Sequence, residues 1–369
     1  MTPPVSDSLR PQVSLAPLTT LGVGGEARFF LDAATEEQIA AALDWAVKHG
    51  VAVTLLGGGS NVLVSDRGVD GLVVRVRVRG IQERDVPGDA TKVICEVGAG
   101  EELDRAVVHT IESGYGGLEC LSGIPGYVGA TPIQNVGAYG QEIADTVVAV
   151  RVIDRATRQV EIFENADCRF TYRNSVFKGE RRDRHVILTV TLALNRGGTP
   201  RVHYPEIVRE LSLRGGDPAS LADVRAVVLA VRRSKSMVID AADPNRRSVG
   251  SFFVNPMVTV EQADDIEERA RVAAFEAQSM PRFPVGERVK LSAAWLIERA
   301  GFTKGTTDGA VGISTRHALA IVNRGGATAA EILSFARRVR DSVVERFGVA
   351  LAAEPVLIGF SEQEASALR

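Results

Sequence analysis

Two glycine-rich stretches carry the residue types that could hold an anionic ligand. One is Gly57-Gly58-Gly59-Ser60-Asn61; the other, Ser122 to Gly140, holds five glycines and two prolines in nineteen residues. So many glycines disfavour a regular helix or strand, and the Ile, Val and Tyr of the second stretch disfavour a solvated linker. Glycine leaves backbone N–H groups able to face a phosphate. On residue types alone, a packed loop without a ligand remains an equal alternative.

The first stretch does not fit the common nucleotide templates. It lacks the Gly-Lys-Ser/Thr ending of a P-loop and the Rossmann glycine spacing. Apolar runs at 62–64 and 72–76 predict that strands, not a helix, follow it. Taken alone, it is more typical of a tight hairpin without a ligand. If it does cradle phosphates, it does so in a strand–loop–strand nest.

The segments around these stretches predict the elements that position them. A strand at 27–31, a helix from an N-cap at Thr35 to a stop at Gly50, and an apolar strand at 51–56 lead into the first stretch. Ile39, Leu43 and Val47, spaced four apart, mark the apolar face of that helix. A strand at 93–100 and a helix at 101–113 lead into the second. The chain then continues with strands expected at 147–153, 160–163 and 186–194.

The remainder of the chain is predicted to be richer in helix, which makes the whole an α+β protein. We expect helices at 221–233, 260–275, 291–300 and 327–347, a loop at 281–288, a strand at 317–322 and a closing segment at 349–359.

Composition limits the possible functions. The 369 residues are 45% hydrophobic and 24% charged, as in a soluble globular protein of two or three domains. A net charge of −3 argues against attachment to nucleic acid or to an anionic membrane. No apolar run reaches 18 residues, and the first 16 do not form a signal peptide. Three dispersed cysteines and five isolated histidines predict reduced thiols, a cytoplasmic protein and no metal site.

Four ordered motifs carry a resemblance to a known family. The 56–63 stretch resembles the pyrophosphate loop of flavoproteins of the vanillyl-alcohol-oxidase type. Ile124-Pro125-Gly126 with 132–140, Tyr172 to Lys178, and Gly250 to Pro256 resemble UDP-N-acetylenolpyruvoylglucosamine reductases. The matches run in order over almost the whole chain, from about Leu18 to Gly359.

The resemblance implies a fold and its division. It implies an FAD-binding fold of two α+β subdomains at 17–67 and 68–220, and an α+β substrate-binding domain at 221–324. A C-terminal segment at 325–369 would return to the FAD-binding part. No binding partner beyond a UDP-sugar and NADPH is expected, and we expect a monomer.

The resemblance also implies a reaction and its catalytic residues. NADPH would reduce bound FAD, and a hydride would then pass to an enolpyruvyl ether on the UDP-sugar, a step of peptidoglycan synthesis. Charge that develops beside the substrate carboxylate must be stabilised, and a proton must be supplied. The family pattern places Arg173 in the first role, Ser251 as the proton donor, and Glu354 as a group that polarises the enolpyruvyl ether. One departure is visible, since Ala352-Ala353 stand where an acidic residue and a proline are expected.

The same resemblance implies the binding residues. For FAD they are Leu56, Gly57, Gly58, Gly59, Ser60, Asn61, Ile124, Pro125, Gly126, Gly129, Ala130, Gln134, Asn135, Gly137 and Ala138. For the UDP-sugar they are Tyr172, Tyr204, Lys235 and Asn255. Tyr204 resembles the subclass in which a tyrosine loop closes over substrate, and Lys235 supplies the cation that a diphosphate requires.

Two alternatives remain open at this point. One is another flavoprotein of the same fold, which would oxidise a hydroxylated small molecule with oxygen and would not need Lys235. The other is a nucleotide-sugar binder without catalysis, in which Ser251→Ala or Glu354→Ala would leave ligand affinity intact.

Overall fold

The computed structural model describes residues 5–200, 202–214, 220–272 and 280–368, and they form two compact units. The first unit draws on Met1–Val13, Ala27–Gly58 and Asp70–Ile239, and the second on Ser14–Glu26, Gly59–Val69 and Asp240–Arg369. Each unit is described by itself below.

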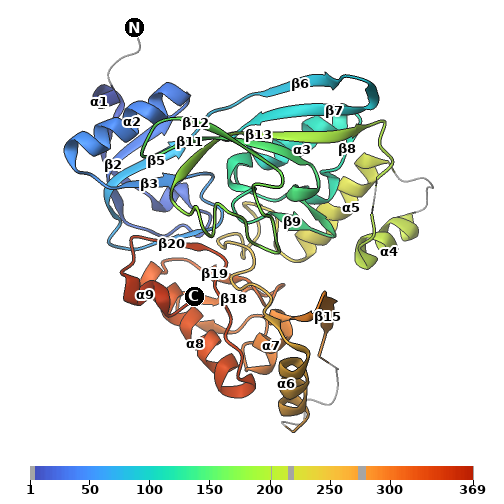
Figure 1. Cartoon of the computed structure of the whole chain (residues 1–369). Helices are drawn as coiled ribbons and strands as arrows, with labels where there is room; N and C mark the ends of the chain where they lie inside the picture. The colour runs from blue at the N-terminus through green and yellow to red at the C-terminus, as the bar shows by residue number, and fades with distance from the viewer. Residues whose placement is uncertain (1–4, 201, 215–219, 273–279, 369) are drawn as a thin grey trace. The chain divides into compact units, whose positions relative to one another are not determined.

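A four-stranded sheet begins the first unit. Its strands lie in the order β1, β2, β5, β3 (Figure 1), with bounds Arg10–Ser14, Glu26–Ala33, Val69–Val76 and Val53–Leu56. Helix α1 is Val5–Ser8, and helix α2 is Glu36–His49. As predicted, the Thr35 side chain caps α2 by accepting from the Gln38 amide, and Gly50 ends it in a left-handed conformation. Val47 is 74% exposed, however; Ala42 and Ala46 are buried beside Ile39 and Leu43.

A six-stranded sheet forms the larger part of the first unit. Its order is β12, β11, β13, β7, β6, with β8 also paired to β13. The bounds are Val160–Glu164, Val147–Asp154, His185–Arg196, Asp89–Gly98, Ile81–Val86 and Tyr115–Gly116. All these pairs are antiparallel. The β11–β12 pair confirms the strands expected at 147–153 and 160–163 and joins them as an antiparallel pair.

The two sheets share one apolar core in the first unit. Strands of both sheets contribute to it, together with α2 and with α3 (Leu103–Glu112). Helices α4 (Pro205–Arg214) and α5 (Leu221–Ser234) pack on a separate small cluster that includes Cys120 and Ile207. Short 3-10 helices at Glu119–Leu121, Val128–Ala130 and Ile143–Asp145, and the β9–β10 pair (Gly137–Ala138, Gln141–Glu142), order the second glycine-rich stretch.

The first glycine-rich stretch joins strands of two different sheets. Strand β3 pairs in parallel with β5, whereas β4 (Val62–Val64) pairs in parallel with β20 (Val356–Ile358). The strand–loop–strand prediction is therefore confirmed. The hairpin alternative is wrong, because β4 takes a partner nearly 300 residues away, as in the Val62↔Val356 pair.

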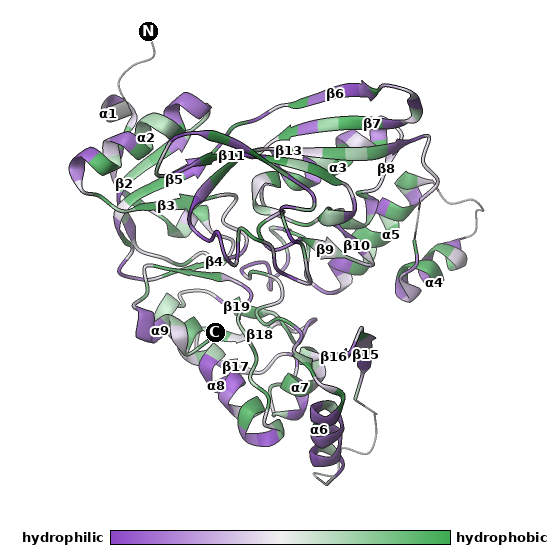
Figure 2. Ribbon diagram, viewed as in Figure 1, coloured by the Kyte–Doolittle hydropathy of each residue, from purple (hydrophilic) through white to green (hydrophobic). Residues whose placement is uncertain are grey.

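The second unit has its own core. Its long helix α8 (Ala329–Phe347) buries eight residues, among them Phe335 and Phe347. The other elements are η1 (Ala16–Leu18), β14 (Met257–Val258), α6 (Val260–Val272), β15 (Arg282–Val285), β16 (Arg288–Leu291), α7 (Ala293–Arg299), β17 (Thr307–Asp308), β18 (Val311–Ile313), β19 (Ile321–Asn323) and α9 (Glu362–Ser366). Helix α6 is mostly hydrophilic (Figure 2), and Ala263, Ile266 and Ala270 are its buried apolar residues.

Several local predictions for this unit need correction. The loop expected at 281–288 is a β-hairpin, β15–β16, in which Val285 pairs with Arg288 across Gly286-Glu287. The strand expected at 317–322 is confined to β19. Helix α6 is described to Val272, and its expected end at Phe275 lies outside the described residues.

The boundaries of the two units differ from those of the four segments expected from the sequence. Helix α5, expected to open a substrate domain, belongs to the first unit, and segments at 14–26 and 59–69 belong to the second. Among the described residues, no helix combines the length and the apolar character needed to cross a bilayer.

Candidate active site

The glycine-rich stretches meet by backbone contact in the first unit. A Cβ at Gly58 would lie 2.8 Å from the Cα of Gly126, and a Cβ at Gly129 would lie 2.5 Å from the Cβ of Ala99. Both distances are shorter than real contacts of this kind, so only glycine permits the packing. The loops at Gly58, at Gly126 to Gly129 and at Ala99 therefore pack closely at glycine positions that carry no side chain. Such a backbone surface is suited to binding the pyrophosphate of FAD.

Asn135 is built into the second stretch. It is 1% exposed and has a left-handed backbone, with φ of 46°. Its side-chain amide donates to Glu142 Oε2 at 2.6 Å and to the Thr171 carbonyl at 3.2 Å, and its Oδ1 accepts from the Ala144 amide at 3.2 Å. These three hydrogen bonds use the Asn135 side chain to order the loop. Any contact between Asn135 and FAD is therefore expected from the Asn135 backbone.

Arg173 braces the same loop. Its guanidinium donates to the carbonyls of Asn135 at 3.2 Å and Gly137 at 2.8 Å. Its φ is 54°, a costly backbone conformation for a residue with a Cβ, and such strain is concentrated at functional sites. Lys178 Nζ donates to the Arg173 carbonyl at 3.0 Å, and the Arg173 guanidinium lies 5.2 Å from the Tyr172 ring centroid. Arg173, Tyr172 and the loop therefore form one assembly.

In the second unit, the backbone segment that contains Ser251 lies next to the segment that contains Glu354. Phe253 and Ala353 form an antiparallel bridge, and the Glu354 amide donates to the Phe252 carbonyl at 2.9 Å. The residue that follows Ser251 is thus hydrogen-bonded to Glu354, although about 100 residues separate them in sequence. Both side chains are half-buried.

Asn61 ties the end of the first glycine-rich stretch to this pair. Its side-chain amide donates to the Glu354 carbonyl at 3.3 Å, and its own carbonyl accepts from the Val356 amide at 3.0 Å. Asn255 lies near the pair in sequence, but its Oδ1 accepts from the Ala293 amide at 2.9 Å, at the start of α7. The structure thus gives Asn255 a role in positioning a helix.

Tyr204 and Lys235 lie together in the first unit. Tyr204, immediately before α4, packs edge-on against Tyr139 with ring centroids 5.5 Å apart. Lys235 caps α5, and its Nζ lies 6.0 Å from the Tyr139 centroid and 2.7 Å from Glu206 Oε2. Burial raises the pKa of Tyr139 to about 12. Together with Arg232, which is described next, this group contains two basic side chains, two tyrosines and the carboxylate of Glu206.

Sequence reasoning missed three members of this group. Arg232 is 7% exposed, donates to the carbonyls of Gly123 and Met237, and has a pKa lowered chiefly by burial. Glu206 and Tyr139 were also missed. Arg232 precedes Lys235 by three positions on α5, and Glu206 follows Pro205 in the first turn of α4, so helical spacing could have indicated both.

The remaining predicted residues fall at the expected loops. Leu56 ends β3 as a buried residue; Gly57, Ile124, Pro125, Gln134, Gly137 and Ala138 are half-buried, and Ala130 is exposed. Ser60 accepts at its carbonyl from Thr20 Oγ1 at 3.3 Å, and a Cβ at Gly59 would overlap the Leu18 carbonyl. Arg173, Tyr172, Tyr204 and Lys235 belong to the first unit, and Ser251, Asn255 and Glu354 to the second.

Comparison with known proteins decides the family. An FAD binding domain model matches residues 27–162, and a model of the UDP-N-acetylenolpyruvoylglucosamine reductase C-terminal domain matches residues 243–358. A UDP-N-acetylenolpyruvoylglucosamine reductase of Thermobifida fusca is 47% identical over 96% of this chain and 99% of its own. The chain belongs to the UDP-N-acetylenolpyruvoylglucosamine reductase family.

Other members of the reductase family agree. The Mycobacterium tuberculosis (strain ATCC 25177 / H37Ra) enzyme is 45% identical over 94% of each chain. The solved reductase of Thermus caldophilus has a TM-score of 0.63 at 27% identity, and the match covers 95% of this chain and 99% of the other. The predicted FAD-binding fold with a C-terminal domain is confirmed, and the chain is an FAD-dependent oxidoreductase of the reductase family. The two models contain the glycine-rich stretches and the Ser251–Glu354 pair; Arg173, Tyr204 and Lys235 lie between them.

Proposed function

We propose that this chain reduces the enolpyruvyl group of UDP-N-acetylglucosamine enolpyruvate to a lactyl ether, giving UDP-N-acetylmuramate for peptidoglycan synthesis. NADPH is the hydride donor. The names of relatives at 43–47% identity support the substrate. The observation that carries the proposal is the backbone pairing that brings the segment containing Ser251 next to the segment containing Glu354, because this reaction needs both a proton donor and a polarising carboxylate.

The loops of the first unit hold FAD in this proposal. Gly57, Gly58 and Gly126 offer backbone N–H groups to the pyrophosphate. Gly129 donates its own N–H to the Ala99 carbonyl and allows the two segments to pack closely, and Arg173 keeps the 134–138 segment in place. FAD held by these loops would supply the hydride chemistry that links NADPH to the methylene carbon of the substrate.

Ser251 and Glu354 act on the substrate at the other reacting carbon. Ser251 Oγ donates a proton to the carbon next to the carboxylate, which completes the addition of two hydrogens to the double bond. A serine hydroxyl is a weak acid, so its donation needs a polarising neighbour. Glu354 supplies that polarity to the enolpyruvyl group, and Arg173 stabilises the charge on the substrate carboxylate.

The cluster around Lys235 binds the UDP part of the substrate. Lys235 meets the diphosphate, and Tyr204 offers an aromatic face and a hydroxyl. Tyr172, which lies beside Arg173, is a further substrate-binding residue. Tyr204 is 42% exposed immediately before α4, which supports a segment that closes over bound substrate. In the second unit, Asn255 is a further substrate-binding residue of this proposal, and its side chain holds the start of α7.

We also infer where the protein works and in which form. Three buried, unpaired cysteines suit the reducing cytoplasm, where the nucleotide-sugar is made and used. The protein acts as a monomer in this proposal.

The test is a steady-state assay with product identification. NADPH consumption should require added UDP-N-acetylglucosamine enolpyruvate, and the product should be heavier than the substrate by two hydrogen atoms. Oxygen uptake with a hydroxylated substrate, and no NADPH consumption, would contradict the proposal in favour of an oxidase. Substrate binding without any turnover would favour a nucleotide-sugar binder.

A further inference from the structure

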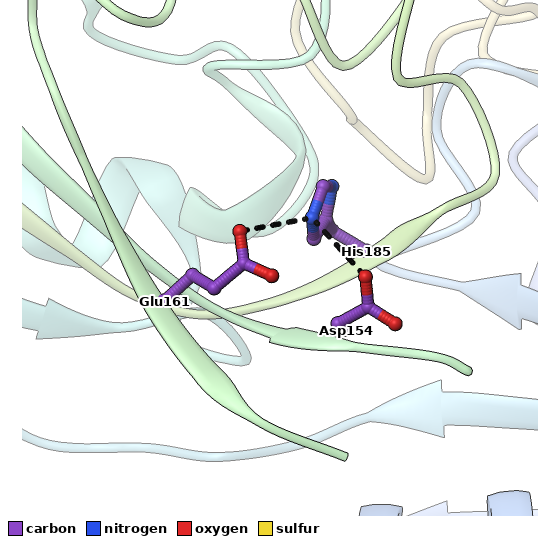
Figure 3. A group of neighbouring side chains, drawn as sticks. All are labelled: Asp154, Glu161 and His185. Atoms are coloured by element: carbon purple, nitrogen blue, oxygen red, sulfur yellow. Dashed lines mark ion pairs between the residues drawn. The ribbon is translucent and has the colours of Figure 1, made fainter. Parts of the chain in front are cut away.

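Three side chains that the reductase mechanism does not use converge at one end of the six-stranded sheet. Asp154 ends β11, Glu161 lies in β12, and His185 begins β13, directly opposite Asp154. One ligand atom from each lies within 4.8 Å of the others. Figure 3 shows the imidazole directed at both carboxylates.

His185 has polar atoms without hydrogen bonds. Its side chain is 1% exposed, and neither ring nitrogen has a hydrogen-bond partner. Nε2 lies 3.6 Å from Glu161 Oε2 and 3.9 Å from Asp154 Oδ2, too far for hydrogen bonds. Leaving a buried polar group unsatisfied destabilises the folded protein. The space between these three atoms therefore favours a bound group that satisfies the nitrogen.

Two aromatic rings fix the orientation of the imidazole. Phe163 and Phe177 pack edge-on to it, with ring centroids 5.1 and 6.3 Å away. A neutral imidazole presents a lone pair to a cation.

Asp154 is prepared as a ligand by its own partners. It is 0% exposed, and its Oδ1 accepts from the Ala156 and Thr157 amides at 2.8 and 2.9 Å. Its Oδ2 accepts from Arg184 Nε at 2.8 Å. Hydrogen bonds of this kind orient ligating carboxylates in metal sites.

We propose that His185 Nε2, Asp154 Oδ2 and Glu161 Oε2 bind one divalent transition-metal ion of the Zn²⁺ class, with water completing the coordination. Ligands about 2.0–2.2 Å from a tetrahedral Zn²⁺ lie about 3.3–3.6 Å apart. The two separations from His185 Nε2, 3.6 and 3.9 Å, are close to that range, and the two carboxylates must approach one another to reach it when they are as far apart as the 4.8 Å limit of the group. Imidazole disfavours Mg²⁺ and Ca²⁺, which prefer oxygen ligands alone. Glu161, 36% exposed in its side chain, gives the ion access from solvent. The isolated histidines of the sequence had predicted no such site, because β-strand pairing, not spacing, assembles it.

The test uses the full chain, stripped with a chelator and titrated with Zn²⁺ alone. We expect one equivalent to bind at micromolar concentration and to raise the melting temperature, with weaker binding at lower pH because protons compete for His185. His185→Gln should abolish binding. Glu161→Gln should weaken it by at least the about 10- to 100-fold that second-shell changes cost.

His109 offers a matched control. Its Nε2 lies 2.7 Å from Glu83 Oε1 in an exposed pair of the same chemistry, so His109→Gln should leave Zn²⁺ binding unchanged. Failure of the wild-type chain to bind Zn²⁺ at micromolar concentration would overturn the proposal. Equal binding by wild type and Glu161→Gln would also overturn it, and that variant decides the matter if His185→Gln does not fold. A Co²⁺ spectrum with thiolate charge-transfer bands would assign the metal to a cysteine instead.

Discussion

Lys235 and Glu206 form an ion pair in which Nζ lies 2.9 and 2.7 Å from the two carboxylate oxygens. The lysine that the proposal assigns to the substrate diphosphate is therefore charge-balanced by a residue of α4 in the first unit. A bound diphosphate must displace or share this partner. Glu206 thus tunes the affinity that Lys235 can offer.

Lys235→Ala should raise the substrate KM about 10- to 100-fold, because a charge-assisted hydrogen bond contributes about 1.5–3 kcal/mol. Bound FAD should stay unchanged. Glu206→Gln is the matched variant, and it should keep or lower KM because it frees the lysine. Steady-state kinetics with flavin quantification measure both, and an unchanged KM in Lys235→Ala would reduce Lys235 to a helix-end residue.

Ser251→Ala should slow substrate reduction by about 10²–10⁴, the usual contribution of general acid catalysis, while NADPH still bleaches the flavin at the wild-type rate. Stopped-flow absorbance separates the two half-reactions. Ser361→Ala serves as the control, because Ser361 accepts from the Glu364 amide at the start of α9. That variant should lose about 0.5–2 kcal/mol of stability and keep its turnover. Near-wild-type reduction in Ser251→Ala would end the proton-donor assignment.

Arg173→Lys should lower turnover and loosen FAD binding together, because the carbonyls of Asn135 and Gly137 accept from two different nitrogens of a planar guanidinium, and lysine has a single nitrogen on a flexible chain. Arg169→Lys is the control. Arg169 also has a left-handed backbone, with φ of 48°, but its side chain pairs with Glu180 in an exposed position. Turnover and flavin content measure the difference, and equal effects of the two substitutions would contradict a specific role for Arg173.

Gly58→Ala should reduce the flavin bound per protein, because the new Cβ would lie 2.8 Å from the Gly126 Cα and force the two loops apart. Gly179→Ala tests for a general effect of glycine replacement. A Cβ there meets its nearest atom, the Ser175 carbonyl oxygen, at 3.4 Å. The ratio of flavin to protein absorbance reports the result. Full flavin content in Gly58→Ala would show that the loops are not the cradle.

Asp104→Asn should destabilise the first unit. Asp104 accepts from two guanidinium nitrogens of Arg225 at 2.6 and 2.9 Å and from the Gly123 amide at 2.6 Å. At pH 7 the expected loss is about 1–2 kcal/mol, because solvent reaches the pair and screens it.

The pH dependence of this loss has a defined sign. Burial raises the pKa of Asp104, but the hydrogen bonds from Arg225 and Gly123 lower it by more, so the folded pKa lies below the ordinary 3.8. The stabilisation is fully present above about 3.8 and is lost as pH falls through the folded pKa. Urea titrations should therefore show the wild-type advantage shrinking below that pH. A constant difference would contradict the account.

The sequence predicted the elements that local signals define. Thr35 and Gly50 mark the ends of α2, and Thr328 caps α8 at the start of the expected helix. The β15–β16 hairpin was missed because Pro284 read as a loop residue, although Gly286-Glu287 is a two-residue turn. Helix α4 was missed too, although proline at the first position, Pro205, is a start signal.

The candidate site likewise has a part that the sequence predicted and a part that it did not. Glycine content located both loops, and the family resemblance located Ser251 and Glu354. Local sequence patterns could not predict contacts between segments that are distant in sequence, because these contacts form only in the folded chain. Examples are the pairing of β4 with β20, the Lys235–Glu206 ion pair and the group around His185.

The most direct test is an anaerobic double-mixing experiment on the purified protein. NADPH should bleach the flavin absorption band, and UDP-N-acetylglucosamine enolpyruvate added afterwards should restore it rapidly, with the reduced sugar nucleotide as product. A flavin that stays bleached until oxygen enters would contradict the proposed reduction.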